Sequence, residues 1–421
     1  MAADRRFTFL LSASAVSNLG DGIGKVALPL LATTLTRDPA LIAGLSVAQF
    51  LPWLLFALPS GVLVDRVDRR LAIVVANAAR AVIIGGLALL VAVDGAAIWL
   101  VYAAAVLIGM AETVADTASN ALVPAMVAGD RLDHANSRLQ SAETIGQNFL
   151  GGPLGSVTFA VFAAFPLLLN SFGFALAAAL LLAVAGGYRP ARETTTHQPV
   201  LTELRDGLRW VRNSPLMLRL MLITGAISMV YELALAQLVL YALEHLRLSE
   251  AMFGVFAAIA GAGGLAGAFV APKLIRALRR RAVVTAGLFL AGACIMAMGL
   301  TSNPVVASVL FGVFGIPVMA VNVVLATVRH TSVPEEYLGR VLGAWRTVVF
   351  GSIPVGALAG GLLAKIAGGS AAMFVVSGVL QMTLAVAAFL LLRRFGQDLV
   401  PRAALRRPRS LDVLEMDRHA E

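Results

Sequence analysis

Long apolar stretches separated by short polar segments run through almost the whole of this chain. Each stretch is close to the roughly 20 residues that an α-helix needs to cross about 30 Å of hydrocarbon at about 1.5 Å per residue. The pattern therefore predicts membrane-spanning helices. Twelve spans are expected, at residues 8–35, 41–64, 71–93, 97–123, 136–160, 163–188, 216–243, 250–272, 282–301, 304–328, 340–364 and 370–392.

The composition agrees with this pattern. Hydrophobic residues make up 59% and charged residues 14% of the 421 residues, whereas soluble domains have roughly 45–50% and 25%. The first apolar block is too long for the core of a cleaved signal peptide, so we expect it to remain in the mature protein as a membrane-spanning helix. The one cysteine, Cys294, falls in a span and offers neither a disulfide nor a metal set. No catalytic constellation is present, so we expect no enzyme, no metal and no cofactor.

The distribution of lysine and arginine predicts the orientation, because these residues are retained on the cytoplasmic side. With the N-terminus inside, the outer loops hold three of the 33 cations, Arg37, Arg247 and Lys365, and the spans hold another three. The remaining 27 are cytoplasmic. We therefore expect both termini in the cytoplasm, and the net charge of +9 reflects topology and anionic lipid contact rather than nucleic-acid binding.

The two halves of the chain repeat one plan. A shift of 210 residues places Gly44 on Gly254, and Arg66, Arg69 and Arg70 on Arg276, Arg279 and Arg280. Parallel six-helix repeats are one plan of alternating-access transporters, which hold their substrate between the halves. We expect an N-terminal bundle at 1–188, a cytoplasmic linker with an amphipathic helix at 189–215, a C-terminal bundle at 216–394 and a cytoplasmic tail at 395–421.

The loop between the second and third spans resembles the signature of the major facilitator superfamily. The matching residues are Gly61, Asp65, Arg66, Arg69 and Arg70, while Asp68 stands at the usual glycine position. The resemblance implies an all-α membrane protein with twelve helices in two pseudo-symmetric six-helix bundles. It also implies a charge network at the cytoplasmic helix ends. Asp68 at the glycine position puts the tight turn of the loop in doubt, but not the charge network. Ile275 replaces the acidic residue in the second half.

A second motif lies in the fifth span and is similar to the glycine-proline element of superfamily exporters. It comprises Gly151, Gly152, Pro153 and Gly155, with Ser156 where a further glycine is common. Small residues let helices approach closely, and proline removes a backbone donor. With Gly20-Asp21-Gly22, Ala121 to Pro124 and Glu203 to Pro215, the chain resembles the branch of the enterobactin exporter and macrolide efflux proteins.

Ionisable residues within spans are costly and are therefore functional candidates. Asp21 and Lys25 are one helical turn apart, so each could neutralise the other, or Asp21 could carry the coupling proton. Arg80 should pair with a carboxylate from a neighbouring helix. The carboxylates available for that pairing are Asp21, Glu112 and Asp116. The candidates for proton coupling are these three together with Glu143 and Arg80. Interhelical hydrogen bonding is the alternative role for these groups.

The second half offers fewer polar residues within its spans. Tyr231 and Glu232 correspond to Asp21 and Gly22 in the repeat, and Arg346 lies in the eleventh span. Together with Asp21 and Lys25, these residues are candidates for the substrate cavity. A structural role in packing is the alternative for each.

These features predict a secondary transporter of a bacterial cytoplasmic (inner) membrane. It would export a small hydrophobic or amphipathic molecule, such as a drug, antibiotic or siderophore, by proton antiport with alternating access. We expect a monomer whose partners are the substrate, protons and lipids, without nucleic acid. The alternatives are a solute uptake permease of the same fold and a membrane sensor that does not transport.

Overall fold

A computed structural model describes the chain except residues 1, 128–130, 185, 190–199, 397–398 and 400–421. Within the described part, all regular structure is helical. The N-terminal group contains α1 (Ala2–Leu35), α2 (Pro39–Val64), α3 (Arg69–Ala92), α4 (Ile98–Met126), α5 (Leu132–Glu143), the π-helix η2 (Thr144–Leu150), α6 (Gly151–Val161) and α7 (Phe165–Leu182).

A second set of helices follows in the other half of the chain. It begins with α8 (Val200–Asn213), which falls on the predicted amphipathic helix, whereas most of the predicted tail lies outside the described residues. The C-terminal group contains α9 (Pro215–Leu235), α10 (Leu238–Leu240), the π-helix η3 (Tyr241–His245), α11 (Glu250–Leu300), α12 (Pro304–Ser332), α13 (Glu335–Ala367) and α14 (Ser370–Leu392).

The helices agree with an all-α membrane protein. Within the described residues, nine helices or continuous helical runs are long and apolar enough to cross a membrane. One of them, α11, is two helices merged across a non-helical residue, Arg279. The long helix α1 and the continuous run from α5 through η2 to α6 coincide with predicted spans as well. This arrangement is consistent with the twelve predicted spans.

The connection between the eighth and ninth predicted spans differs from the expectation. Residues 273–281 were expected to form a loop, but they are helical on both sides of Arg279, whose φ of 65° and ψ of 156° mark the kink between two helices. Leucine, alanine and arginine are good helix formers, so the break is confined to one residue. The sixth span also ends early, at Leu182, and the fourth continues to Met126.

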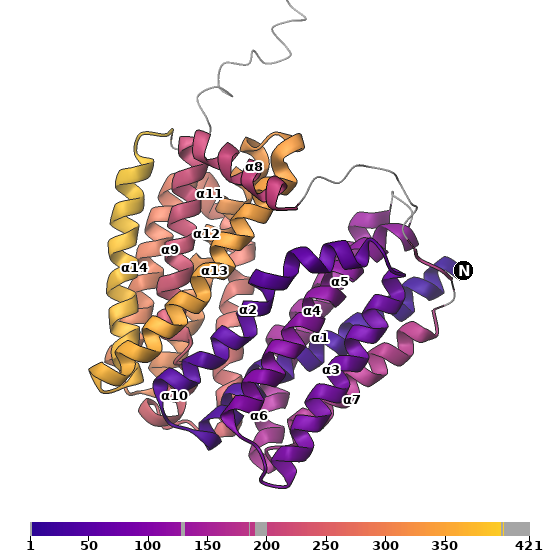
Figure 1. Ribbon diagram of the computed structural model, residues 1–421. Helices are drawn as coiled ribbons and strands as arrows, with labels where there is room; N and C mark the ends of the chain where they lie inside the picture. Colours follow the sequence, from indigo (N-terminus) through magenta and orange to yellow (C-terminus); the bar gives the residue numbers. More distant parts are fainter. Residues whose placement is uncertain (1, 128–130, 185, 190–199, 397–398, 400–421) are drawn as a thin grey trace, which may run out of the picture.

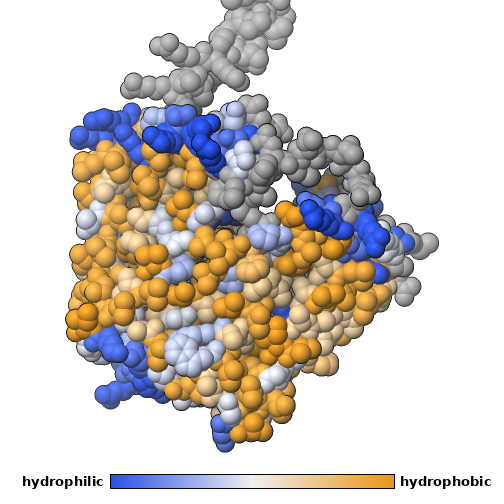
Figure 2. Space-filling view, viewed as in Figure 1, coloured by the Kyte–Doolittle hydropathy of each residue, from blue (hydrophilic) through white to orange (hydrophobic). Residues whose placement is uncertain are grey.

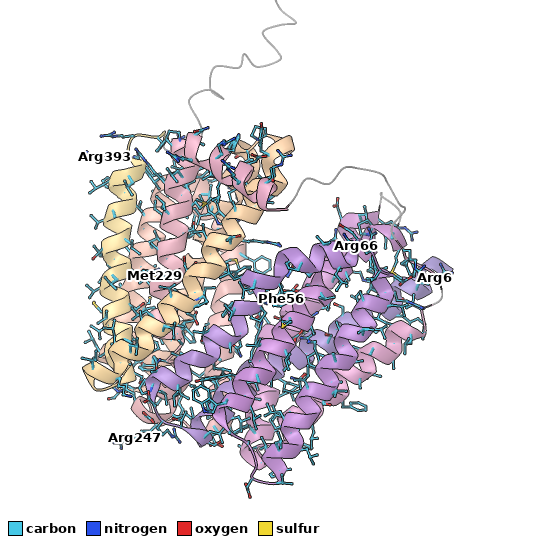
Figure 3. All side chains as sticks on the ribbon, viewed as in Figure 1. Arg6, Phe56, Arg66, Met229, Arg247 and Arg393 are labelled. Carbon is cyan, nitrogen blue, oxygen red and sulfur yellow. The ribbon has the colours of Figure 1, made fainter. Side chains whose placement is uncertain are left out.

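On the face of the molecule shown in Figure 2, apolar residues form a broad belt, with hydrophilic residues gathered above and below it. Figure 3 labels Arg6, Arg66 and Arg393 at one end of the bundle, which we call the basic end, and Arg247 at the other, the opposite end. Exposed apolar side chains such as Val82, Phe172 and Phe269 lie within spans. This surface suits a hydrocarbon environment between two aqueous phases.

The two groups meet at the opposite end and diverge towards the basic end (Figure 1). Their contacts run mainly between α2 and α13 and between α6 and α11. Near the opposite end, Gln237 donates a hydrogen bond of 3.0 Å to the carbonyl of Pro39. Lys365 forms an ion pair of 2.7 Å with Asp38. The molecule is therefore closed at the opposite end.

Loss of the Lys365–Asp38 pair is expected to loosen this closure slightly. The hydrogen bond from Lys365, followed by that from the Ala40 amide, lowers the pKa of Asp38 below its usual range. The pair therefore contributes above pH 3.8, the ordinary pKa, and is lost as pH falls below it. Because Lys365 is 61% exposed, Lys365→Gln should shift the closing equilibrium by only about 0.5 kcal/mol.

The measurement is the distance between spin labels at Ala97→Cys and Ser302→Cys, which lie in opposite-end connections of the two groups. The labels would be placed in a Cys294→Ala background. At pH 7 the Lys365→Gln variant should show a small rise in the long-distance population. An equal shift in Arg393→Gln, at the basic end, would contradict a role specific to the pair.

Candidate functional site

A buried ion pair joins α1 to α3 inside the N-terminal group. Arg80 on α3 is only 1% exposed, and its Nη2 atom donates to the Oδ1 atom of Asp21 on α1. The guanidinium carbon also lies 4.0 Å from the ring centroid of Phe174 on α7. A guanidinium stays charged in proteins, so its burial requires these partners. Asp21 is thus the partner of Arg80 among the acidic residues considered.

Neutral polar groups complete the surroundings of this pair. Arg80 Nη1 lies 3.4 Å from Ser17 Oγ and 3.5 Å from Asn77 Oδ1, and the Ser17 hydroxyl lies 3.3 Å from the same Asn77 oxygen. The pair borders a cavity with about 410 Å³ of empty volume. The cavity is lined by Leu10, Ala13, Ser14, Ser17, Asn18, Asp21, Ile73, Asn77, Arg80, Ala115, Asp116, Ser119 and Leu181.

Pairing of Asp21 with Lys25, one of the alternatives considered for these two residues, is wrong. Lys25 donates instead to Oε1 of Gln147, and Gln147 Nε2 donates to Asn18 Oδ1 over 2.7 Å. Gln147 belongs to η2, where the π-helix shifts the register of the chain. Lys25 is exposed and is held by a neutral amide, while Arg80 reaches Asp21 from another helix. The charge of Asp21 is therefore compensated by Arg80 of a neighbouring helix and not by Lys25 on the next turn of α1.

The other acidic candidates occupy different surroundings. Asp116 on α4 lines the same cavity as Asp21. Glu112 is half-buried one turn earlier on α4. Glu143 is exposed at the end of α5, where it accepts a hydrogen bond of 3.2 Å from Gln140. The structure thus brings Asp21 and Asp116 to one cavity and leaves Glu143 outside its lining.

The C-terminal candidates lie on two helices. Glu232 on α9 is buried, and the side chain of Ser46 on α2, in the other group, lies beside its carboxyl group. The neighbouring Tyr231 stacks on Phe314 at 5.4 Å between ring centroids. Arg346 on α13 is exposed. Glu232 therefore contacts the other group, whereas Tyr231 packs within its own.

The signature loop folds without a glycine at its turn. Asp68 has an extended backbone, with φ −66° and ψ 120°, and caps α3 by accepting from the Leu71 amide. Burial raises the pKa of Asp68, but hydrogen bonds from the Tyr188 and Leu71 amides outweigh it and lower the pKa. The residue that departs from the family pattern thus ties the α2–α3 turn to the segment after α7.

The charged residues of the signature loop divide into two kinds. Arg69 donates to the Ala121 carbonyl over 3.0 Å, and Arg70 donates to the Val184 carbonyl. Asp65 and Arg66 are exposed, and neither takes part in the described ion pairs. Gly61 ends no helix, because α2 continues to Val64. In this state Arg69 and Arg70 connect the loop to other segments of the N-terminal group. Asp65 forms no ion pair with either arginine among the described ion pairs.

The glycine-proline motif makes the tightest helix contacts around the site. A methyl group on Gly151 would lie 2.5 Å from Gly22 Cα, and one on Gly155 would lie 2.9 Å from the Ile23 carbonyl oxygen. Pro153, between them, is half-buried. A methyl group on Gly152 would instead face α11, at 3.3 Å from the Gly254 carbonyl oxygen. The motif thus lets α6 pack against α1 on one side and α11 on the other.

Ser156 joins the two helix groups at this contact, although it departs from the glycine pattern. It is fully buried, and its Oγ atom accepts a hydrogen bond of 2.6 Å from the Gly254 amide of the other group. Ser156→Ala removes this hydrogen bond between the two groups and should destabilise the closed opposite end by about 0.5–1.5 kcal/mol. The expected result is a larger long-distance population between labels at Ala97→Cys and Ser302→Cys.

Thr158→Ala on the same helix is the matched control, because the Thr158 hydroxyl bonds only to carbonyls of its own helix. Equal distance distributions in the two variants would contradict the role of Ser156 between the groups.

Several site residues escaped the sequence reasoning. Ser17, Asn77 and Phe174 surround Arg80, but none is ionisable. Asn77 precedes Arg80 by three residues, so the helical spacing of these two polar residues was a usable signal. Phe174 carried no such signal.

Comparisons with known proteins place the chain among transporters. Residues 2–419 match the sequence profile of a family described as "Transmembrane secretion effector". The multidrug efflux pump Tap of Mycobacterium tuberculosis is 28% identical over 411 residues, covering 95% of this chain and 96% of Tap. Tap of Mycolicibacterium fortuitum is 24% identical, covering 90% and 94%.

Solved structures show the same fold at lower identity. A bacterial homologue of the human lysosomal transporter Spinster, in an inward-facing and unoccupied conformation, has a TM-score of 0.72 at 14% identity and covers 93% of this chain and 97% of its own. The nucleoside transporter NupG has a TM-score of 0.74 at 13% identity, with coverages of 91% and 99%.

Proposed function

The chain belongs to the transmembrane secretion effector family of the major facilitator superfamily, and from this membership we propose that it is a proton-coupled exporter of small hydrophobic or amphipathic molecules. Drugs, antibiotics and siderophores are the candidate cargoes. The similarity to multidrug efflux pumps over 95% of the chain supports export rather than the uptake of a solute.

One observation carries the transport proposal: the two helix groups contact each other at the opposite end and diverge at the basic end (Figure 1). Contacts at one end only are what one state of an alternating-access carrier requires. We propose that the basic end faces the cytoplasm of a bacterial inner membrane, with both termini on that side. The structure would then correspond to the state that loads cargo from the cytoplasm.

Proton coupling is assigned to the Asp21–Arg80 pair. A carboxylate paired with a guanidinium can bind a proton only if the pair separates or loosens. Protonation of Asp21 would therefore weaken its contact between α1 and α3. Asp116 lines the same cavity and is the second acidic group on this path, while the cavity's hydroxyl and amide groups can bind water. Glu112, one turn before Asp116 on α4, and Glu143, at the end of α5, are assigned supporting roles.

Reconstitution tests the proposal directly. The full chain in liposomes would be supplied with ethidium, a fluorescent amphipathic cation, or with erythromycin, under an imposed proton gradient. We expect accumulation of at least one compound against its concentration, coupled to proton flow in the other direction. Movement driven by sodium but not by protons would refute the coupling, and gradient-driven movement of cargo with the protons would favour an uptake permease. Saturable binding without any flux would favour a sensor.

A further inference from the structure

A second pocket lies at the basic end, apart from the cavity beside Asp21. It is formed where the start of α1, the end of α4 and the first turns of α5 meet, and it has about 410 Å³ of empty volume. Its walls are of two kinds. They are lined by the apolar residues Phe7, Met126, Val127 and Ala135 and by the basic residues Arg131, His134 and Arg138.

The basic residues share one face of α5. Arg131 is the residue that precedes the helix, and His134 and Arg138 follow at positions 3 and 7 beyond it, so their side chains lie above one another. All three are exposed. The first amides of α5 add the partial positive charge of a helix N-terminus at the same place. The acidic residue of the first turn, Asp133, is exposed and does not line the pocket.

The apolar walls are parts of the protein core rather than loose surface. Ala135 is 3% exposed, and Phe7, Met126 and Val127 pack against the same core cluster. A ligand that fits must therefore offer a phosphate-like anion to the arginines and an apolar part to Phe7 and Met126. Free phosphate satisfies only the first requirement.

We propose that this pocket binds the headgroup of an anionic phospholipid, with the phosphate between Arg131 and Arg138 and the upper part of the acyl chains along Phe7 and Met126. Phe7 follows Arg6, which Figure 3 places at the basic end, so the pocket lies near the end of the membrane-spanning region, which is the depth of lipid headgroups. The pocket shares no lining residue with the cavity beside Asp21, so the proposed lipid site is separate from the proposed coupling site.

Native mass spectrometry of the full chain in a mild detergent tests the assignment, with short-chain phosphatidylglycerol and phosphatidylcholine as probes. The wild type should bind one phosphatidylglycerol at least about tenfold more tightly than phosphatidylcholine. Arg131→Gln/Arg138→Gln should lose at least about tenfold in that affinity. Arg212→Gln/Arg393→Gln, which removes two exposed basic-end charges outside the pocket, should keep it.

Equal losses in the two double variants would overturn the proposal, because the attraction would then be spread over the basic end. Displacement of the lipid by inorganic phosphate at equal concentration would overturn it in favour of a soluble anion. A thermal unfolding scan of both variants without lipid checks their folding, and His134→Gln provides a milder variant that keeps both arginines. Retained binding in all three variants would likewise refute the site.

Discussion

The variant Asp21→Asn is expected to lose all proton-driven transport while it still exchanges cargo down a concentration gradient. Asparagine keeps the shape of the side chain and can accept a hydrogen bond from Arg80, but it cannot bind and release a proton at neutral pH. In proteoliposomes, accumulation of ethidium under a proton gradient should fall to the level of protein-free liposomes. Counterflow between labelled and unlabelled ethidium, without a gradient, should continue.

The single substitution leaves Arg80 buried without a counter-charge, which costs about 3–5 kcal/mol in comparable cases. A variant without activity could therefore be a variant that does not fold. Asp21→Asn/Arg80→Gln removes both charges and avoids this cost, so it should fold. Like the single variant, it should lose proton-driven accumulation and keep counterflow. Asp94→Asn, in an exposed loop, is the control with the same chemical change. Normal gradient-driven transport in the double variant would remove Asp21 from the coupling role.

The spans were predictable because each is set by local composition. Crossing hydrocarbon requires an uninterrupted apolar stretch, and this requirement is met within each segment without reference to any other. Most observed helix ends therefore lie within a few residues of the predicted spans. The exceptions are at helix ends, where capping and helix propensity decide at which residue a helix stops. Around Arg279, residues that were expected to form a loop are helical on both sides of the kink.

The pairing of charges was only partly predictable. Burial of Arg80 demanded a carboxylate, and sequence alone narrowed the choice to three acidic residues. Which one it meets depends on how α1 and α3 are rotated against each other, and that depends on packing with α7 and η2. The same dependence explains Lys25: a register shift in η2 presents Gln147 to it, and no spacing rule on α1 contains this information.

Ser156 shows how a departure from a family pattern can be misread. In sequence it is a missing glycine, which would weaken the argument for close helix contact. In the structure the small serine still allows the close approach of α6 and α11. Its hydroxyl oxygen accepts a hydrogen bond from the Gly254 amide of the other group. The partner lies 98 residues away, so no local signal reveals it.

The same contact carries the second prediction with a large effect: Gly254→Ala should abolish closure of the opposite end and stop transport. A methyl group at Gly254 would lie 2.1 Å from the carbonyl oxygen of Gly152 and 2.7 Å from Ser156 Oγ. The first obstacle is backbone, which cannot rotate away as a side chain would. The two groups must therefore separate at this point, at a cost of about 1–3 kcal/mol or more to the closed state.

Spin labels at Ala97→Cys and Ser302→Cys should report a predominantly long distance in Gly254→Ala and a predominantly short one in the parent protein. Gly264→Ala is the matched control on the same helix, because its nearest neighbour would be the flexible Met319 side chain at 4.0 Å. That variant should keep the parent distance and transport rate. If Gly254→Ala also keeps them, the contact between α6 and α11 does not determine which end is closed. The difference between the two glycines separates a steric block at the interface from a general effect of alanine in α11, because both substitutions alter the helix itself in the same way.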